Sequence, residues 1–215
     1  NALTGRNEKV GNWAGVTVDK KESAIKKVYY DGAEELIAVD LPGAYSMSPF
    51  TAEESVTRDY VINERPDVII NIVDATNLSR SLFFTTQLLE LGIPVVVALN
   101  KADINLKKET EINVSMLADK LGCPVINTIS TVSTHEGLHQ IVDAAVCAKG
   151  KGQTAPFTQS YAGIADREAA KEADKERYRF VNEIVRQVEK RKVYTSQRNF
   201  QDAIDNILTD PIIGL

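Results

Sequence analysis

Apolar runs alternate with amphipathic stretches through the middle of the chain. Nearly continuous apolar runs cover residues 68–73 and 95–99, and another begins at residue 124. Apolar residues recur at helical spacing in three stretches: 78–91, 114–121 and 138–148. Continuous runs are typical of strands buried on both faces, whereas a spacing of three to four residues indicates amphipathic helices. The alternation predicts an α/β fold with a doubly wound, mostly parallel sheet.

The chain before this region has a different pattern. Residues 24–30 alternate enough to predict a strand, and Asp31-Gly32 is typical of a hairpin turn. A returning strand is expected at residues 36–39, ending at Asp40. Residues 1–3 have the composition of a helix interior, which predicts a helix at the start of the chain.

After residue 148 the pattern changes again. Residues 149–165 contain glycine, proline and polar residues and are interpreted as a linker. A long charged helix is expected at 166–192, and a second helix at 196–208. The buried stripe of the first is predicted to comprise Tyr178, Val181, Ile184, Val185 and Val188, and its charges are interpreted as a solvated face. These two helices would form a small C-terminal helical subdomain.

Charge and composition exclude several classes of protein. The net charge of −5 argues against a nucleic-acid-binding surface. No apolar run approaches the roughly 18 residues of a membrane span. Cys123 and Cys147 lack metal-type spacing, and both are predicted to be buried free thiols, as in a reducing cytoplasm.

Asn100-Lys101-Ala102-Asp103 follows an apolar run and is the strongest candidate for chemistry. The carboxyl ends of parallel strands are where α/β sheets bind ligands. A carboxylate at Asp103 can accept hydrogen bonds from the ring N–H and the exocyclic amine of guanine together, a paired contact that adenine does not offer. Asn100 would tie neighbouring loops to the base, and the Lys101 stem would lie over the ring or the sugar. A solvated turn is the alternative, so position and context decide.

Two further segments suit phosphate and magnesium. Asp40, Leu41, Pro42 and Gly43 end the strand at 36–39, where Asp40 could hold a metal-bound water and Gly43 would let a backbone N–H approach a phosphate. The glycine-rich segment 11–18 offers Thr17 as a hydroxyl ligand for magnesium. Turn residues without a ligand are the alternative for both.

His135-Glu136-Gly137-Leu138-His139 fits the pattern of zinc proteases. That mechanism needs both histidines on one face of one helix. Because Gly137 falls at the expected helix start, His135 would precede the helix, and we favour a simple surface helix.

The residues resemble the cytosolic GTPase region of FeoB, the family of bacterial ferrous iron transporters. The resemblance rests on five blocks of sequence: 11–18, 40–48, 65–78, 89–103 and the tail after residue 165. It implies an α/β fold of the P-loop GTPase type, with a G-domain at 1–148, a linker at 149–165, a helical spacer domain at 166–210 and an approach to a membrane segment at 211–215. It also implies nucleotide-binding roles for Gly15, Val16, Thr17, Asp40, Leu41, Pro42, Gly43, Asn100, Lys101, Asp103, Ser130, Thr131 and Val132. Thr17 falls in switch I, Asp40 to Gly43 open switch II, and Ser130 to Val132 resemble the last nucleotide-binding motif.

Two departures from that family pattern bear on activity. The phosphate-loop pattern G-x-x-x-x-G-K-[ST] does not occur in the sequence. By the resemblance, residues 1–5 match the helix that follows this loop. The first strand and the loop are therefore expected to be missing, leaving a gap between the strands that end at Asp40 and Asp74. Ala44 stands where Ras-like GTPases place a water-orienting glutamine, which predicts slow hydrolysis and no catalytic side chain at that position.

The resemblance implies a GTP-hydrolysing regulatory domain, with GTP or GDP and magnesium as ligands, magnesium being held by Thr17 and Asp40. Its partner would be the membrane transport domain of the same parent chain, at the cytoplasmic face of the bacterial inner membrane. Potassium dependence and homo-oligomer formation stay open. Two rivals also stay open: a soluble small GTPase of the ribosome-assembly or tRNA-modification type, and a non-hydrolysing guanine-nucleotide switch or interaction module.

Overall fold

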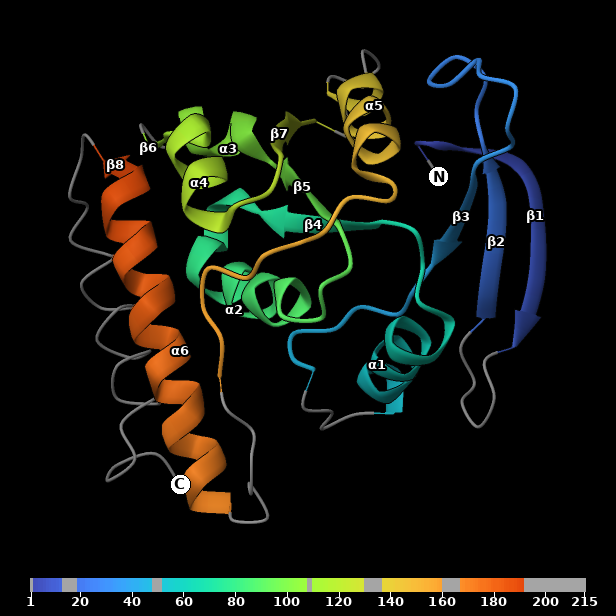
Figure 1. Cartoon of the computed structure of the whole chain (residues 1–215). Helices are drawn as coiled ribbons and strands as arrows, with labels where there is room; N and C mark the ends of the chain where they lie inside the picture. Colours follow the sequence, from blue (N-terminus) through green and yellow to red (C-terminus); the bar gives the residue numbers. More distant parts are fainter. Residues whose placement is uncertain are drawn as a thin grey trace.

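A parallel sheet forms the centre of the protein, in a computed structural model that describes residues 2–12, 19–47, 52–107, 110–129, 137–159 and 167–191 (Figure 1). Its strands are β4 (Ile69–Asp74), β5 (Val95–Asn100) and β7 (Val125–Thr128), with β5 in the middle. Both pairings are parallel. All three strands were predicted from the apolar runs. Strand β5 shows the reason most fully, because it is buried at every position before Asn100 and a strand covered on both faces needs apolar residues throughout.

Helices cover both faces of this sheet. The short 3₁₀ helix η1 (Ala75–Asn77) leads into α2 (Leu78–Leu89), and α5 (Leu138–Ala148) lies on the opposite face (Figure 1). Alternate residues of β5 supply the two cores: Val95, Val97 and Leu99 join the cluster on the α2 side. Val96 and Ala98 pack with Ile141 of α5. The doubly wound arrangement is therefore confirmed.

The N-terminal region is an antiparallel sheet of β1 (Thr4–Asn12), β2 (Asp19–Ile25) and β3 (Ile37–Asp40). The helix expected at the start of the chain is wrong, because strand β1 already begins at Thr4. Pairing with β2 holds β1, and its sequence lacks the apolar alternation that would reveal a strand. The strand expected at 24–30 is also misplaced: β2 ends at Ile25, and a turn follows in which Tyr29 N donates to Lys26 O (2.9 Å).

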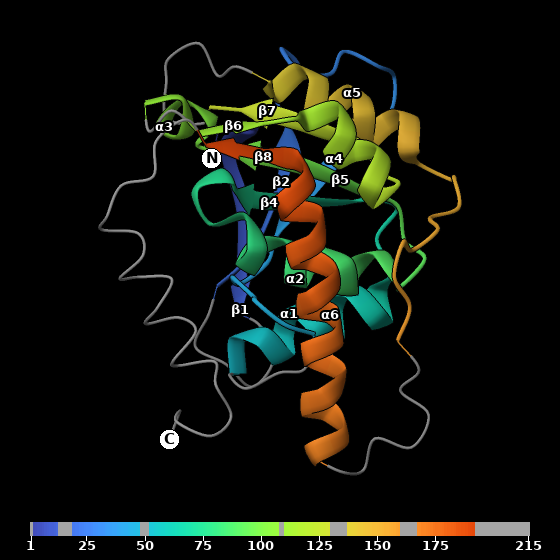
Figure 2. The same ribbon diagram turned by 90° about the vertical axis from the view of Figure 1, so that its left-hand side faces the viewer.

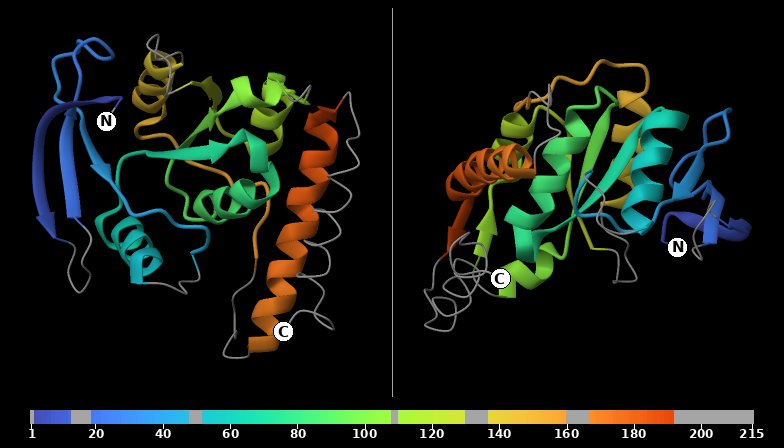
Figure 3. Two further views of the ribbon diagram at one scale, coloured as in Figure 1. Left: turned by 180° about the vertical axis from the view of Figure 1, so that it is seen from behind. Right: turned by 90° about the horizontal axis from the view of Figure 1, so that it is seen from below.

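The antiparallel sheet and the parallel sheet are not joined. Within the described residues, β3 pairs with β2 and β4 pairs with β5, but no pairing connects β3 to β4. Seen from behind, the antiparallel sheet stands beside the parallel one (Figure 3). This arrangement agrees with the gap expected between the strands that end at Asp40 and Asp74. Helix α1 (Ala52–Glu64) follows β3 and was not predicted, because its buried positions include the polar residues Glu54 and Thr57.

Between β5 and β7 the chain forms α3 (Ala102–Lys107), β6 (Thr110–Ile112) and α4 (Val114–Leu121). Helix α4 has the predicted bounds: the Asn113 side chain accepts from Met116 N at its start, and Gly122 takes the left-handed conformation (φ +68°) at its end. Neither α3 nor β6 was predicted, since both are too short to show a periodic pattern.

The long helix α6 (Arg167–Val188) lies across α2 and α4 (Figure 2). Val181, Ile184 and Val188 belong to the main core, as predicted. Tyr178 was wrongly placed in the buried stripe, because its exposed fraction is 41%. The helix also ends earlier than expected, at Val188, because β8 (Glu189–Arg191) pairs with β6 in extended conformation.

Residues 196–208 and 211–215, where a second helix and a membrane approach were expected, lie outside the described residues. None of the helices in the described part of the chain combines the length and the hydrophobicity that a bilayer crossing requires.

Candidate nucleotide site

The carboxyl ends of β4 and β5 bring Asp74 and Asn100 side by side, because these residues are partners in the parallel ladder. Lys101 follows Asn100 directly, and its Nζ lies 2.6 Å from Asp74 Oδ2. Burial raises the pKa of Asp74, but hydrogen bonds from Lys101 and Thr76 outweigh burial and hold the pKa below its ordinary value. The hydrogen bond with Asp74 in turn raises the pKa of Lys101, so both groups are charged at neutral pH.

The backbone of Lys101 has φ +65°, in the left-handed region that non-glycine residues rarely adopt. The turn redirects the chain from β5 into α3, and Asp103 lies in the first turn of that helix. Asn105, also on α3, is buried and donates from Nδ2 to the carbonyl oxygen of Ala75 (2.6 Å). Strained backbone at a strand end is a feature of ligand sites, since the surrounding contacts must hold it in place. Asn100, Lys101 and Asp103 thus span the corner between the end of β5 and the first turn of α3.

The loop after β3 is held by side chains of two helices. Thr57 of α1 donates from Oγ1 to the Pro42 carbonyl (2.7 Å), and Glu54 accepts from Tyr45 N (3.2 Å). Gln87 of α2 accepts from Met47 N (2.8 Å). These contacts fix the loop that begins with Asp40, Leu41, Pro42 and Gly43.

Gly43 itself is exposed, and a Cβ built there would meet no other atom within 4 Å. Neither packing nor a positive φ requires a glycine at this position. Its lack of a side chain is consistent with the close approach of a ligand to the backbone.

Of the two residues expected to bind magnesium, the structure describes Asp40. Asp40 lies at the end of β3 and is exposed, so its carboxylate oxygens suit a hard cation. Thr17, the second expected ligand, lies outside the described residues together with Gly15, Val16, Ser130, Thr131 and Val132. In the part of the chain that the structure describes, no three His, Cys, Asp or Glu side chains gather as a metal site would require.

Helix α5 begins at Leu138, directly after Gly137. His135 and Glu136 therefore precede that helix in the sequence, as expected, and both lie outside the described residues. His139 Nδ1 lies 2.7 Å from Asp143 Oδ2, one turn further along α5. Of the two histidines of the zinc-protease pattern, the structure thus describes only His139, on α5.

A buried arginine that the sequence analysis missed joins α6 to the rest of the protein. Arg177 is completely buried, with Nη2 2.7 Å from Glu90 Oε2 and 3.1 Å from Gln159 Oε1, and Nη1 3.2 Å from Thr86 Oγ1. The other oxygen of Glu90 accepts from Gln159 N (2.6 Å). The interpretation of the α6 charges as a solvated face is therefore wrong at this position. The only sequence clue is that Arg177 precedes Val181 and Ile184 at helical spacing.

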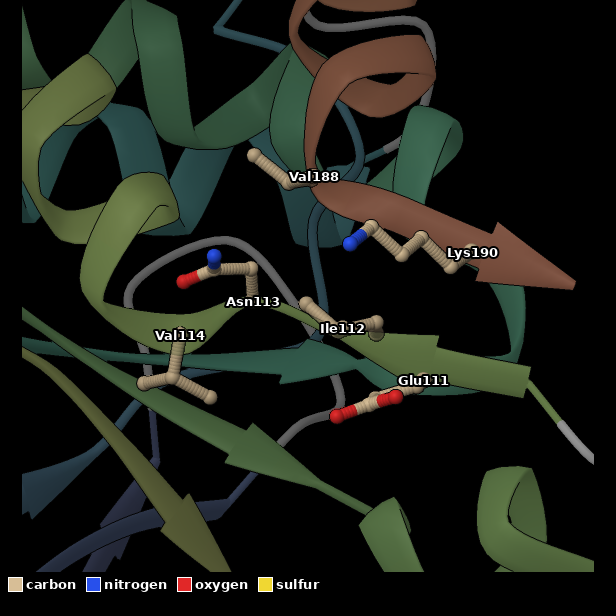
Figure 4. A pocket seen from close by; sticks show the side chains of 6 residues that line it. All are labelled: Glu111, Ile112, Asn113, Val114, Val188 and Lys190. Atoms are coloured by element: carbon tan, nitrogen blue, oxygen red, sulfur yellow. The ribbon is translucent and has the colours of Figure 1, made fainter.

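A hollow of about 340 Å³ lies between β6, β8 and the start of α4. Figure 4 shows the residues that line it: Glu111, Ile112, Asn113, Val114, Val188 and Lys190. Asn113 is already engaged there, since its side chain caps α4 and its N–H donates to Val188 O (2.8 Å). None of the predicted site residues lines this hollow, and Asn113 serves the junction between α4 and α6.

The two cysteines differ in their exposure to solvent. Cys123 is buried as predicted, and burial raises its pKa to about 12. Cys147 is exposed, which contradicts the prediction, because it lies on the solvent side of α5.

Comparisons with known proteins agree with this geometry. The ferrous iron transport protein B family profile matches residues 1–145. The Fe(2+) transporters FeoB of Salmonella typhimurium and Escherichia coli K12 are each 44% identical over 135 residues, which cover 61% of this chain and 17% of those proteins. The chain thus matches only a small part of the curated relatives.

Solved structures cover more of the chain. The cytosolic domain of Legionella pneumophila FeoB superposes with a TM-score of 0.76 at 28% identity, covering 89% of this chain and 93% of that one. An S. thermophilus NFeoB mutant bound to GDP gives 0.74 at 32% identity, covering 88% and 93%. The fold is therefore that of the P-loop GTPases. Since the family profile matches more than half of its residues, the chain belongs to the ferrous iron transport protein B family.

Proposed function

We propose that this chain is the guanine-nucleotide-binding part of a ferrous iron transporter. The observation that supports the proposal is the arrangement at the ends of β4 and β5, where Asn100 ends β5, Lys101 takes a left-handed turn and Asp103 lies in the first turn of α3. Asp103 would accept from the guanine ring and amine, and Asn100 would tie the base to neighbouring loops. Relatives solved with GDP and with GMPPNP support this function.

The loop after β3 would bind the phosphate end. Gly43 leaves room for its backbone N–H to approach a terminal phosphate, and Asp40 would hold magnesium through a bound water, with Thr17 as its partner. Magnesium, when bound, would neutralise charge on the phosphate oxygens.

We further propose that the complete protein hydrolyses GTP slowly and couples its nucleotide state to Fe(II) uptake at the cytoplasmic face of the membrane. Ala44 offers no side chain that could orient the attacking water, which supports turnover no faster than the roughly 10⁻⁴ to 10⁻² per second of GTPases that carry a glutamine there and act without an activator. Because the chain belongs to the ferrous iron transport protein B family, we no longer favour the first alternative, a soluble GTPase of the ribosome-assembly or tRNA-modification type. The non-hydrolysing switch remains the second candidate, favoured by the same alanine.

The contacts of α2 suggest how a signal would leave the nucleotide site. Gln87 contacts the loop after β3 through Met47 N, while Thr86 and Glu90 contact Arg177 of α6. A movement of the loop would thereby shift α2 against the helical tail.

Nucleotide titration tests the proposal. We expect the full-length protein to bind GDP at least about 100-fold more tightly than ADP, because a site built around a carboxylate and an amide rejects a base with the opposite hydrogen-bond pattern. Equal affinities would contradict guanine binding. Release of phosphate from GTP separates the two candidates, since a non-hydrolysing switch would bind GTP without turnover.

A further inference from the structure

Asp74 and Ala75 lie outside the predicted motif and contact the segment that would bind guanine. The corner where β4 enters η1, formed by Asp74 and Ala75, contacts both ends of the segment Lys101–Asn105, which leads from β5 into the first turn of α3. We infer that Asp74 and Asn105 are positioning residues, which hold Asp103 at the place where it would meet the guanine base. The inference rests on the function proposed above.

The carboxylate of Asp74 is fixed in orientation. Its Oδ1 accepts from both the N–H and the hydroxyl of Thr76 (2.9 and 2.7 Å). The remaining oxygen, Oδ2, faces Lys101 Nζ at 2.6 Å. Since two hydrogen bonds orient the carboxylate, Lys101 meets an acceptor of fixed position. The Lys101 side chain, which would lie along the nucleotide, is thereby held at its Nζ.

Asn105 fixes the other end of the segment, within α3. Its side chain is buried, and its amide donates to the Ala75 carbonyl, the residue next to Asp74. Asp103 lies between these two anchors, one turn or less from each along the chain. A shift of either anchor would move the Asp103 carboxylate, and hydrogen bonds weaken steeply when their geometry is lost.

A role in positioning explains features that a role in stability does not. The Lys101 side chain of the Asp74–Lys101 pair is 49% exposed, and ion pairs this exposed contribute little to the free energy of folding. The left-handed backbone of Lys101 costs free energy, so contacts on both sides of it are needed to maintain the turn. The structure thus has a strained turn held at both ends, immediately around the proposed base contact.

The Asp74→Asn variant tests the inference in the full-length protein, with GDP and IDP as probes. IDP lacks the exocyclic amine, so the ratio of the two Kd values reports the contact of Asp103 with that amine. We expect the wild type to prefer GDP by about tenfold or more. Asp74→Asn should weaken GDP binding about fivefold and reduce the preference for GDP, expressed as Kd(IDP)/Kd(GDP), about threefold. Asn105→Ala, checked for folding by circular dichroism, should reduce the same ratio.

Glu34→Gln is the matched control, because it removes an exposed carboxylate–lysine pair with Lys149 (3.1 Å). That variant should keep both affinities. A wild type with no preference for GDP over IDP would refute the proposed base contact and the inference with it. A wild type with the preference, and an Asp74→Asn variant that retains it in full, would refute the inference alone.

Discussion

The guanidinium of Arg177 lies 2.7 Å from the carboxylate of Glu90, and this pair joins α6 to α2 inside the protein. Phe157 lies beneath the same guanidinium, 5.0 Å from its ring centre. The contact connects the tail of the chain to the helix that also holds the loop after β3. It therefore contributes both to stability and to the proposed transfer of a nucleotide signal.

Replacing Arg177 by alanine should destabilise the protein by about 3 kcal/mol, because Glu90 would be left as a partly buried charge without its partner. Urea unfolding measures the loss. Arg179→Ala is the control on the same helix, since Arg179 is 71% exposed and pairs with Glu172 at 3.6 Å. It should change the free energy of unfolding by less than about 0.5 kcal/mol. Equal losses in the two variants would contradict the importance of the buried pair.

Gly137 should not tolerate a side chain. Its φ is +82°, and a Cβ would lie 2.0 Å from the Asn127 carbonyl oxygen. Gly137→Ala should therefore cost about 3 kcal/mol in unfolding free energy. Gly92→Ala, at φ +73° but with open space around it, should cost only about 1 kcal/mol. Similar costs at both sites would mean that strand β7 does not approach the start of α5 so closely.

The two cysteines should differ in reactivity toward iodoacetamide at pH 8. Burial raises the pKa of Cys123 to about 12, so its thiol is neutral and shielded. Cys147 is exposed and should react. Mass spectrometry of the native protein should find one label, on Cys147, and a second only after unfolding. Fast native labelling of Cys123 would contradict its burial.

The charge of Asp74 should make a small contribution to stability at neutral pH and lose it in acid. Its pKa is lower in the folded protein than its ordinary value of 3.8, so the folded state favours the ionised form. The contribution is present above that value and disappears as the pH falls through the folded pKa. The unfolding free energies of the wild type and of Asp74→Asn should therefore differ at pH 7 and converge below the folded pKa. A difference that grows in acid would contradict the lowered pKa.

The apolar runs were sufficient to predict the parallel sheet and the helices on both its faces. Long periodic stretches such as those at Val114–Leu121 and Leu138–Ala148 carry their own boundary signals in glycine and asparagine. Strands β1 and β8 were missed because their sequences show no apolar alternation, and pairing with β2 and β6 holds them extended.

The candidate site was only partly predictable. Asn100, Lys101 and Asp103 were predicted as base-binding residues because they form a short motif after a buried strand. The contribution of Asp74 depends on the register between β4 and β5, which pairs it with Asn100. Arg177 was missed for a related reason: its partners Glu90, Thr86 and Gln159 come from distant parts of the chain. Such contacts between distant residues are not visible in a local pattern.

The central claim is that Asp103 selects the guanine base. The most direct test is the affinity of the full-length protein and of its Asp103→Asn variant for GDP and XDP. An amide at this position would donate to the second carbonyl of xanthine, so the variant should lose GDP affinity by about 100-fold and gain affinity for XDP. An Asp103→Asn protein that binds GDP as tightly as the wild type would contradict the assignment.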